Sequence, residues 1–316
     1  MEKLICNKVV VCKKVSLVFT FYLLSQLSFA GGAWTQGKGK AYFKLSEFWI
    51  LFDEHFTASG EIDPNTTTGI FNTYLYGEYG LTDKLTLTTN AALFTNNFMR
   101  ARRSSTGTLL TERDGIKALG DIDFGVKYQL SSSDSPIAIA ASLNLGLPTG
   151  RINAGRDNNL QTGDGEFNQQ IQLDIGKGFQ GKSNAHYVNA YVAFNNRTST
   201  GDSFAQRIGR GLDLGREDIF SDEFRFGMEY GIGMMERKLW VIARFYLLES
   251  LRNGDDFEQS TNIFANNTEY TGTSLEVSYY ILEKLGIAAN VGGAFRGEII
   301  AASPSFDLGV FLDLSK

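Results

Sequence analysis

The sequence predicts an all-β protein, a transmembrane up-and-down antiparallel β-barrel of about twelve strands. Three observations carry this prediction. Apolar residues recur at every second position in many segments, long and short connections alternate along the chain, and an export signal precedes a mature chain that has no cysteine. The abundance of Gly, 34 residues against only 4 Pro, is typical of many strands joined by turns.

The amino-terminal segment has the pattern of a secretory signal peptide. Lysines precede a short apolar run from Val15 to Leu24, and small residues follow at Ser28 and Ala30. The run is too short for a transmembrane helix, which needs about 20 apolar residues. We therefore expect residues 1–30 to be removed and residues 31–316 to form the outer-membrane β-barrel.

Cysteine content and charge restrict the class of protein. Cys6 and Cys12 both lie in the predicted signal peptide, so the exported chain has neither a disulfide nor a thiol site. That peptide carries four Lys and one Glu, so its removal changes the formal net charge from −5 to −8. Such acidity argues against a nucleic-acid partner. We expect no cofactor.

Period-2 alternation predicts the strands. Each predicted strand has about the length of a tilted transmembrane strand, roughly 9 to 11 residues plus an overhang. No amphipathic helix and no linker interrupts the series. The predicted ranges are 38–50, 70–81, 84–97, 119–130, 136–148, 167–177, 187–197, 222–233, 238–249, 269–281, 285–296 and 304–315.

The connections between these strands are sorted by length. Tight turns are predicted within 79–87, 130–136, 231–240 and 280–287, and a middling turn at 178–186. Long polar connections are predicted at 51–69, 98–118, 149–166, 197–221 and 250–268, and a shorter one at 296–303. Outer-membrane barrels have short periplasmic turns and long external loops. The pattern therefore predicts a location in the outer membrane of a Gram-negative bacterium.

The stretch "GDIDFGVKYQL" from Gly120 to Leu130 shows which face meets lipid. In a membrane barrel the apolar parity faces lipid, here Ile122, Phe124, Val126 and Tyr128. The other parity then faces the lumen, here Asp121, Asp123 and Lys127. A charge at Phe124 is expected to cost roughly 2 to 4 kcal/mol if it lies near the bilayer midplane. Neutralising Asp123 is expected to alter passage more than folding.

The same parity rule assigns a set of polar residues to the lumen. Two interpretations stay open: a mixed-charge wall that binds the polar group of a ligand, and acids and bases that pair across neighbouring strands to fill the interior. Unpaired buried charge is costly, which favours pairing. The set comprises Asp121, Asp123, Lys127, Gln170, Gln172, Asp174, Arg225, Glu229, Arg244 and Glu276.

Other functional classes are represented by weaker patterns. A lipid-modifying hydrolase or acyltransferase needs a histidine, and the sequence has two, His55 in a predicted external loop and His186 in a predicted periplasmic turn. Asp53 and Ser59 flank His55, as an orienting group and a nucleophile, respectively, would. Further alternatives are a structural or adhesive surface barrel and a soluble secreted sandwich.

Three segments suggest additional sites. The loop at 155–166 holds residues with oxygen ligands of the kind that Ca²⁺ prefers, namely Asp157, Asn159, Asp164 and Glu166. Their spacing does not fit an EF-hand, so we expect a solvated loop and no metal. The cluster Arg100, Arg102 and Arg103 is able to contact phosphates of lipopolysaccharide, or to pair with 112–114 of its own loop. The stretch 31–39 is too short for a plug domain and is expected at the periplasmic mouth of the lumen.

Four segments carry a resemblance to a known family. They are "YGLTDKL" from Tyr79, "ALGDIDFGVKYQL" from Ala118, "IAASLNLGLPTGR" from Ile139 and "HYVNAYVAFNNR" from His186. Together they resemble the meta-pathway phenol-degradation family of bacterial outer-membrane proteins, which is related in architecture to FadL-type transporters. The resemblance runs from about Tyr42 to the carboxyl terminus and is most distinctive at Gly120–Leu130 and at the Pro-Thr-Gly turn that follows Leu147.

The resemblance implies a function and partners. It implies an outer-membrane channel or facilitator for passive uptake of small hydrophobic or aromatic molecules, and no catalytic residue is carried over. The implied partners are outer-membrane lipid with lipopolysaccharide, a small hydrophobic solute and the barrel-insertion machinery. That machinery commonly reads an aromatic last residue, whereas this chain ends in Lys316, after Phe311 and Leu314.

Overall fold

The structure is a computed structural model that describes residues 31–152, 160–163, 165–199, 220–254 and 266–316. Its described residues form sixteen strands and include no helix long and apolar enough to cross a membrane. The strands are β1 (Ala41–Phe56), β2 (Ile62–Thr82), β3 (Leu85–Met99), β4 (Arg102–Arg103), β5 (Leu109–Thr111), β6 (Asp114–Ala118), β7 (Ile122–Gln129), β8 (Ala138–Leu147), β9 (Glu166–Gln180), β10 (Ala185–Ser199), β11 (Glu223–Met234), β12 (Leu239–Ser250), β13 (Glu269–Tyr280), β14 (Leu285–Glu298), β15 (Ile300–Ala301) and β16 (Ser305–Asp313).

These strands close into an antiparallel barrel with twelve strand positions around its wall, which we call staves. This confirms the predicted fold class. Consecutive staves pair with one another, and β16 pairs with β1, so the sheet leaves no free edge at its seam. Two staves are interrupted: β6 and β7 both pair with β3, and β15 and β16 both pair with β1. The hairpin of β4 and β5 is a separate two-stranded sheet.

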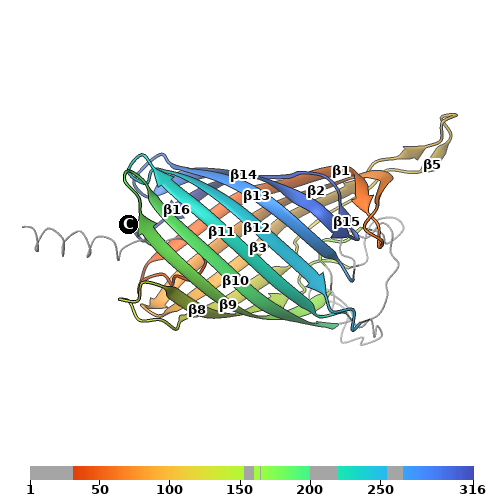
Figure 1. Cartoon of the computed structure of the whole chain (residues 1–316). Helices are drawn as coiled ribbons and strands as arrows, with labels where there is room; N and C mark the ends of the chain where they lie inside the picture. Colours follow the sequence, from red (N-terminus) through yellow and green to blue (C-terminus); the bar gives the residue numbers. More distant parts are fainter. Residues whose placement is uncertain (1–30, 153–159, 164, 200–219, 255–265) are drawn as a thin grey trace, which may run out of the picture.

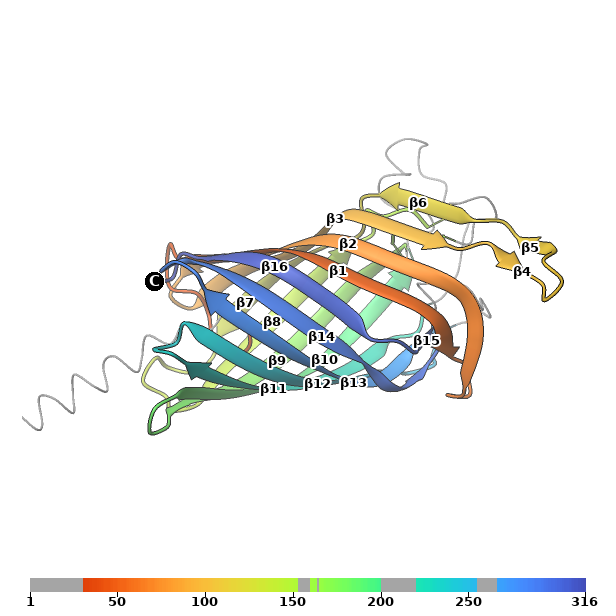
Figure 2. The ribbon, with the colours of Figure 1, turned by 90° about the horizontal axis from the view of Figure 1, so that it is seen from above.

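The two ends of the barrel differ in their connections. Figure 1 shows the carboxyl terminus at the end with the short turns, while β5 and β15 lie at the opposite end. Seen from above, the β4–β5 hairpin projects beyond the barrel at that opposite end (Figure 2). In an outer-membrane barrel the short turns are periplasmic and the long connections are external. We name the two ends accordingly.

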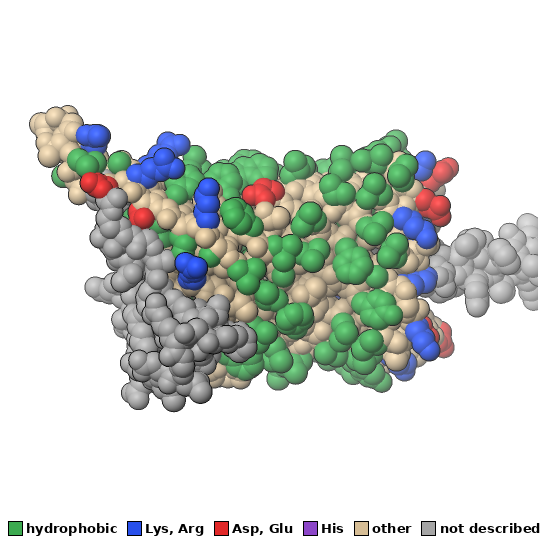
Figure 3. All heavy atoms as spheres, turned by 180° about the vertical axis from the view of Figure 1, so that it is seen from behind, with side chains coloured by type: hydrophobic (Ala, Val, Ile, Leu, Met, Phe, Trp, Pro, Cys, Tyr) green, Lys and Arg blue, Asp and Glu red, His purple; other side chains and the backbone are tan. Residues whose placement is uncertain are grey.

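The outer surface of the barrel is apolar between its ends. Large hydrophobic side chains cover it, and charged groups gather toward the two ends (Figure 3). On β7, Phe124 is 52% exposed, Val126 42% and Tyr128 47%, whereas Lys127 is 6% exposed and points inward. The predicted faces of this strand are therefore observed.

Two predicted loops are largely strands. β1 continues to Phe56 and β2 begins at Ile62, so most of the stretch 51–69 is a paired hairpin with its turn at 57–61. The stretch 98–118 likewise holds β4, β5 and β6. These segments are polar because they rise above the membrane, and polarity there does not prevent the backbone from pairing.

The domain boundary predicted at Ala30 stays a prediction. Residues 1–30, which hold the expected signal peptide, lie outside the described residues. The described chain begins at Gly31 and reaches the first strand at Ala41.

Candidate functional site: the barrel lumen

The described residues line two adjoining cavities inside the barrel. One, of about 760 Å³, reaches the periplasmic end at Lys40 and Lys316, and we call it the periplasmic cavity. The other, of about 470 Å³, lies along β3, β7, β8 and β9, and we call it the polar cavity. Both are lined by Gly31, Gly32, Tyr74, Tyr76 and Asn90, so the cavities meet at these residues.

Aromatic side chains dominate the periplasmic cavity. The rings of Tyr42 and Phe311 stack with centroids 5.7 Å apart, and Tyr280 meets Phe311 edge-on at 4.9 Å. Across the lumen wall, the centroids of Tyr187 and Trp240 are 5.8 Å apart. Such clusters offer both ring faces and hydroxyl groups to a small molecule. The aromatic residues that line this cavity are Tyr42, Tyr74, Tyr76, Tyr187, Trp240, Tyr280 and Phe311.

The mouth of this cavity carries a cation. The ammonium of Lys316 lies over the ring of Tyr280, 3.2 Å from its centroid, and burial lowers the pKa of this lysine. Tyr280 in turn donates a hydrogen bond of 2.7 Å to Asp313. The end of the chain is therefore tied to the wall of the cavity that it borders.

A chain of ion pairs crosses the wall of the periplasmic cavity. Lys44 Nζ lies 2.8 Å from Asp307 and 3.4 Å from Glu276. Arg244 then bridges Glu276, at 3.3 Å, and Glu229, at 3.1 Å. Because each charge has an opposite charge on a neighbouring strand, the wall is polar without holding an isolated ion. Of the two interpretations left open by the sequence, cross-strand pairing is the one observed here.

A second buried group involves Glu78 on β2. Its carboxylate accepts hydrogen bonds from Tyr76, at 2.5 Å, and from Gln36, at 2.7 Å, and pairs with Lys127 at 3.3 Å. The predicted lumen residue Lys127 thus holds a carboxylate that sequence analysis did not select. Gln36 comes from the segment before the first strand, so this group also anchors that segment.

The segment before β1 runs inside the barrel. Ala33 is fully buried and its amide donates to Asn189 Oδ1 at 3.0 Å, while the amide of Gln36 donates to Thr86 Oγ1 at 2.8 Å. Trp34 packs edge-on against Tyr187 with centroids 5.9 Å apart. The segment was expected at the periplasmic mouth, and the structure places it deeper, since Gly31 and Gly32 reach the junction of both cavities.

The polar cavity is lined by amides and carboxylates. Gln170 donates to Gln172 at 3.0 Å, and Gln172 donates to Asp174 at 2.9 Å, which forms a ladder along β9. Arg225 donates to Gln170 at 2.9 Å, and Asp123 borders the same space. The structure therefore places all ten predicted lumen residues on the inner face, while their contribution to solute passage stays a prediction.

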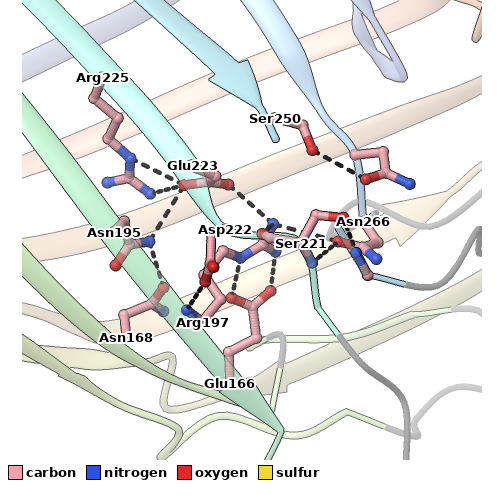
Figure 4. A network of polar contacts seen from close by, with 12 residues as sticks. Glu166, Asn168, Asn195, Arg197, Ser221, Asp222, Glu223, Arg225, Ser250 and Asn266 are labelled. Carbon is pink, nitrogen blue, oxygen red and sulfur yellow. Dashed lines mark hydrogen bonds and ion pairs between the residues drawn. The ribbon is translucent and has the colours of Figure 1, made fainter. Parts of the chain in front are cut away.

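Buried ion pairs close the external end of the polar cavity. Arg197 on β10 pairs with Glu166 on β9 and with Glu223 on β11, 3.0 Å away (Figure 4). Its guanidinium also donates to the backbone oxygen of Ser221 at 3.1 Å and to Asn266 at 3.4 Å. One arginine thus joins the external ends of three neighbouring strands with the chain that leads into β13. We call this set the Arg197 network.

The connection after β8 folds inward beside the Arg197 network. Thr149 donates to the backbone oxygen of Gly120 at 2.6 Å, and the amide of Gly150 donates to Asp121 at 2.8 Å. Thr162 donates to the backbone oxygen of Leu119 at 2.8 Å. The two pieces that carry the family resemblance, the start of "GDIDFG" and the Pro-Thr-Gly turn, therefore contact each other.

Close backbone contact explains the glycine of this turn. A Cβ on Gly150 would lie 2.6 Å from the backbone nitrogen of Gly163, closer than side-chain atoms are tolerated. Leu160 from the same connection is fully buried against Met99 and Ile116. A small apolar cluster therefore fills the external end of the barrel next to β3 and β6.

Sequence analysis missed the aromatic lining of the periplasmic cavity. Tyr42, Tyr76 and Tyr187 were not selected because only charged and amide residues were sought on the polar parity. The signal was present: Tyr42 alternates with Lys44 and Ser46, and Tyr76 alternates with Glu78. An aromatic residue at an inward position of a barrel strand marks the lumen wall as clearly as a charge does.

The candidate triad around His55 is not assembled in the described part of the chain. His55 belongs to β1, not to a loop, and pairs with Asp63 and Ala301. Its Nδ1 is buried and has no hydrogen-bond partner among the described residues. The hydroxyl of Ser59, the predicted nucleophile, is bonded to Thr57 at 3.0 Å. Asp53, His55 and Ser59 are thus not linked as a triad.

His186 has a structural environment. It lies at the start of β10 and not in the turn where it was expected. Its ring stacks on Phe179, with centroids 5.2 Å apart, and its Nδ1 is 2.9 Å from the hydroxyl of Tyr230. Tyr230 is exposed on the outer face, so His186 belongs to the aromatic belt near the periplasmic end.

The acidic loop at 155–166 gives no evidence of a metal site. Asp157, Asn159 and Asp164 lie outside the described residues, and Glu166 is bound to Arg197. The part of the chain that the structure describes contains no cluster of three or more His, Cys, Asp or Glu arranged to hold a metal.

The barrel wall is interrupted beside β16. Pairing of β14 with β16 ends at Gly292 and Ser305, and the preceding residue, Pro304, has no backbone N–H to continue it. A groove of about 610 Å³ opens there, lined by Leu275 on the outer face and by Arg244, which also lines the periplasmic cavity. The apolar surface and the ion-paired lumen wall approach each other at this groove.

Comparison with known proteins identifies the fold. An outer-membrane channel from Pseudomonas putida F1 matches with a TM-score of 0.55 and 14% identity over 90% of this chain and 99% of that one. The NanC porin matches with a TM-score of 0.45 and 9% identity over 85% and 98% of the two chains. The KdgM porin matches with a TM-score of 0.42 and 7% identity over 86% and 98%.

No family model and no curated protein sequence matches the chain. The fold is nevertheless that of an outer-membrane β-barrel, as the likeness to the Pseudomonas channel shows. A closed barrel of this kind with an apolar outer surface belongs in the outer membrane of a Gram-negative bacterium.

Proposed function

We propose that the protein is a passive outer-membrane channel for small aromatic molecules. The observation that carries this proposal is the aromatic lining of the periplasmic cavity, where seven aromatic side chains border one space of about 760 Å³. A space of this size suits a small organic molecule. Stacked and edge-on ring contacts favour aromatic solutes over aliphatic ones of the same volume.

The charges of the cavity wall suit a solute without net charge. Lys44 and Arg244 are both neutralised by neighbouring carboxylates, so they offer hydrogen bonds to a polar substituent without a strong field. The hydroxyl groups of the lining tyrosines add further donors and acceptors. A phenol-like solute, with one polar group on a ring, fits both properties.

Conductance measurements test the channel and its preference. We expect the full chain in a planar bilayer to conduct ions, and benzyl alcohol to reduce the current at lower concentration than cyclohexylmethanol. The difference is expected to be roughly 3- to 10-fold, because an aromatic pair contributes about 0.5 to 1.5 kcal/mol beyond area burial. Replacing Tyr187 and Trp240 together by Leu should remove the difference between the two alcohols.

A lipid-facing aromatic residue supplies the control. Tyr279 is exposed on the outer face of β13, so Tyr279→Leu should leave the preference for benzyl alcohol unchanged. Absence of conductance by the wild-type protein would contradict the channel proposal. Equal inhibition by the two alcohols would contradict its preference for aromatic solutes.

A further inference from the structure

We propose that the external rim of the barrel beside β3 and β6 binds the phosphate groups of lipopolysaccharide. The site consists of Arg100, Arg102, Arg113 and Lys117, which we call the basic rim. All four side chains are exposed. Arg100 follows the end of β3 and Arg102 lies in β4, while Arg113 directly precedes β6 and Lys117 lies within it. The four cations therefore flank the external end of the β3–β6 pair.

The register of these strands turns the basic rim outward. Lys117 lies opposite Asn96, and its neighbour Ile116, opposite Asn97, is buried in the barrel. Since successive side chains of a strand point to opposite faces, Lys117 stands on the lipid-facing side. Arg113 has the same parity as Lys117 on one stave, and Arg100 has the same parity as Asn96 on the neighbouring stave. Both arginines therefore also face outward, closer to the external end.

The cations of the basic rim are available for a ligand. Within the described ranges, Arg100, Arg102, Arg113 and Lys117 form no ion pair with another side chain. This contrasts with the inner face, where the arginines Arg197, Arg225 and Arg244 each have a carboxylate partner. Arg103 is different from its neighbours, since it donates to the backbone oxygen of Gly107 within the β4–β5 hairpin.

Apolar residues lie below the basic rim and between its cations. Leu119 is exposed two residues from Lys117, toward the centre of the membrane. Phe98 lies opposite Gly115, and its ring stacks on Phe71 with centroids 5.9 Å apart. Figure 3 shows basic side chains at the external end directly beside this apolar surface.

The order along the strands fits a phosphorylated glycolipid in the outer leaflet. Acyl chains meet Leu119, on the membrane side of Lys117, and phosphates attached to the sugar head group meet Lys117, Arg113 and Arg100. Phe98 lies between the level of Lys117 and that of Arg100. Guanidinium groups bind phosphate oxygens with paired, charge-assisted hydrogen bonds. A solute such as free phosphate would not use the apolar half of this surface, so the lipid is the ligand to which we commit.

Binding of lipid A tests the proposal. The full chain in detergent is titrated with bisphosphorylated lipid A, and binding is followed by native mass spectrometry. The variant Arg100→Gln/Arg113→Gln/Lys117→Gln is expected to bind roughly 100-fold more weakly, because each cation near an anionic lipid surface contributes about a factor of five. These side chains are exposed, so the variant should keep the heat-modifiable migration of a folded barrel.

Matched ligands and a matched variant make the result decisive. Lys84→Gln/Lys238→Gln/Lys284→Gln removes the same charge from exposed periplasmic turns and should bind lipid A like the wild type. Dephosphorylated lipid A should bind as weakly to the wild type as lipid A does to the rim variant. Loss of less than about threefold in the rim variant, or inorganic phosphate competing at the same concentration as lipid A, would overturn the proposal.

Discussion

Charged side chains have opposite environments on the inner and outer faces of the same strands. On β7, Lys127 is buried on the inner face and pairs with Glu78, while its neighbours Val126 and Tyr128 are exposed to lipid on the outer face. Inner carboxylates and cations occur on most strands and are joined across them. Large apolar side chains dominate the outer positions in the membrane, and Glu47 is a charged residue among them.

The difference teaches that pairing, and not polarity alone, decides where a charge is tolerated. A charge on the inner face is stabilised by an opposite charge from the neighbouring strand, and removing one partner leaves the other buried and unpaired. A charge on the outer face has only lipid around it. The inner face is therefore destabilised by removing one partner of an ion pair, and the outer face by adding a charge.

The largest effect is expected at the Arg197 network. Arg197→Ala leaves the buried carboxylates of Glu166 and Glu223 without their cation. We expect the free energy of unfolding to fall by about 3 to 5 kcal/mol, as for other buried pairs that lose one partner. Urea unfolding of the barrel in detergent, followed by heat-modifiable migration, measures the change.

An exposed arginine at the same end provides the comparison. Arg252 pairs with Glu269 and Glu298 but is half exposed, so Arg252→Ala should cost less than about 1 kcal/mol. Equal losses for Arg197→Ala and Arg252→Ala would mean that burial does not determine how much these pairs contribute.

A smaller effect is expected from adding a charge to the outer face of β7. Phe124→Arg places a cation against lipid, and we expect a loss of roughly 2 to 4 kcal/mol if the residue lies near the bilayer midplane. Asp123→Asn, at the adjacent inner position, should change the unfolding free energy by less than about 0.5 kcal/mol. Its conductance should change instead, because Asp123 borders the polar cavity.

Refolding into vesicles under urea measures both β7 variants. A Phe124→Arg protein as stable as the wild type would show that this position is not in contact with the membrane interior. An Asp123→Asn protein with unchanged conductance would remove Asp123 from the residues that affect passage.

The smallest effect is expected at Glu47, where a charge is already present on the outer face. Its carboxylate accepts a hydrogen bond of 2.7 Å from Thr73, and Leu308 lies opposite it on β16. Glu47→Leu should raise the free energy of unfolding by about 1 kcal/mol, since it replaces an acid at a lipid-facing position.

A double-mutant cycle tests the role of Thr73. Thr73→Val alone should destabilise the barrel by about 1 kcal/mol, because Glu47 then loses its donor, and it should be neutral in the Glu47→Leu background. Additive effects of the two substitutions would show that the hydrogen bond between them contributes nothing.

Most of the barrel was predictable because its signal is local. The alternation of Ile171, Leu173 and Ile175 with Gln170 and Gln172 is determined by the period of an extended chain and needs no knowledge of the partner strands. All twelve staves and the inward side of the ten polar residues followed from it. Strand ends did not follow, because β1 and β2 continue as a hairpin above the membrane, where alternation of polarity is lost.

The candidate site was only partly predictable. Arg225, Glu229 and Arg244 were assigned to the inner face from parity, but their partners depend on register between strands. A shift of two residues keeps the parity of every side chain and changes each pair. The contact of Glu78 with Lys127 and Gln36 is of this kind, since it joins residues from three separate parts of the chain.

The sequence by itself determined a membrane barrel of twelve strands with an apolar outside and a polar inside, because strand period and loop length are properties of neighbouring residues. Only the tertiary structure decided what the lumen contains. The entry of the segment around Ala33 and Gln36, the inward fold of the connection at Thr149 and Thr162, and the aromatic periplasmic cavity all depend on closure of the barrel. Closure brings together side chains that are far apart in sequence, and no local pattern records which of them meet.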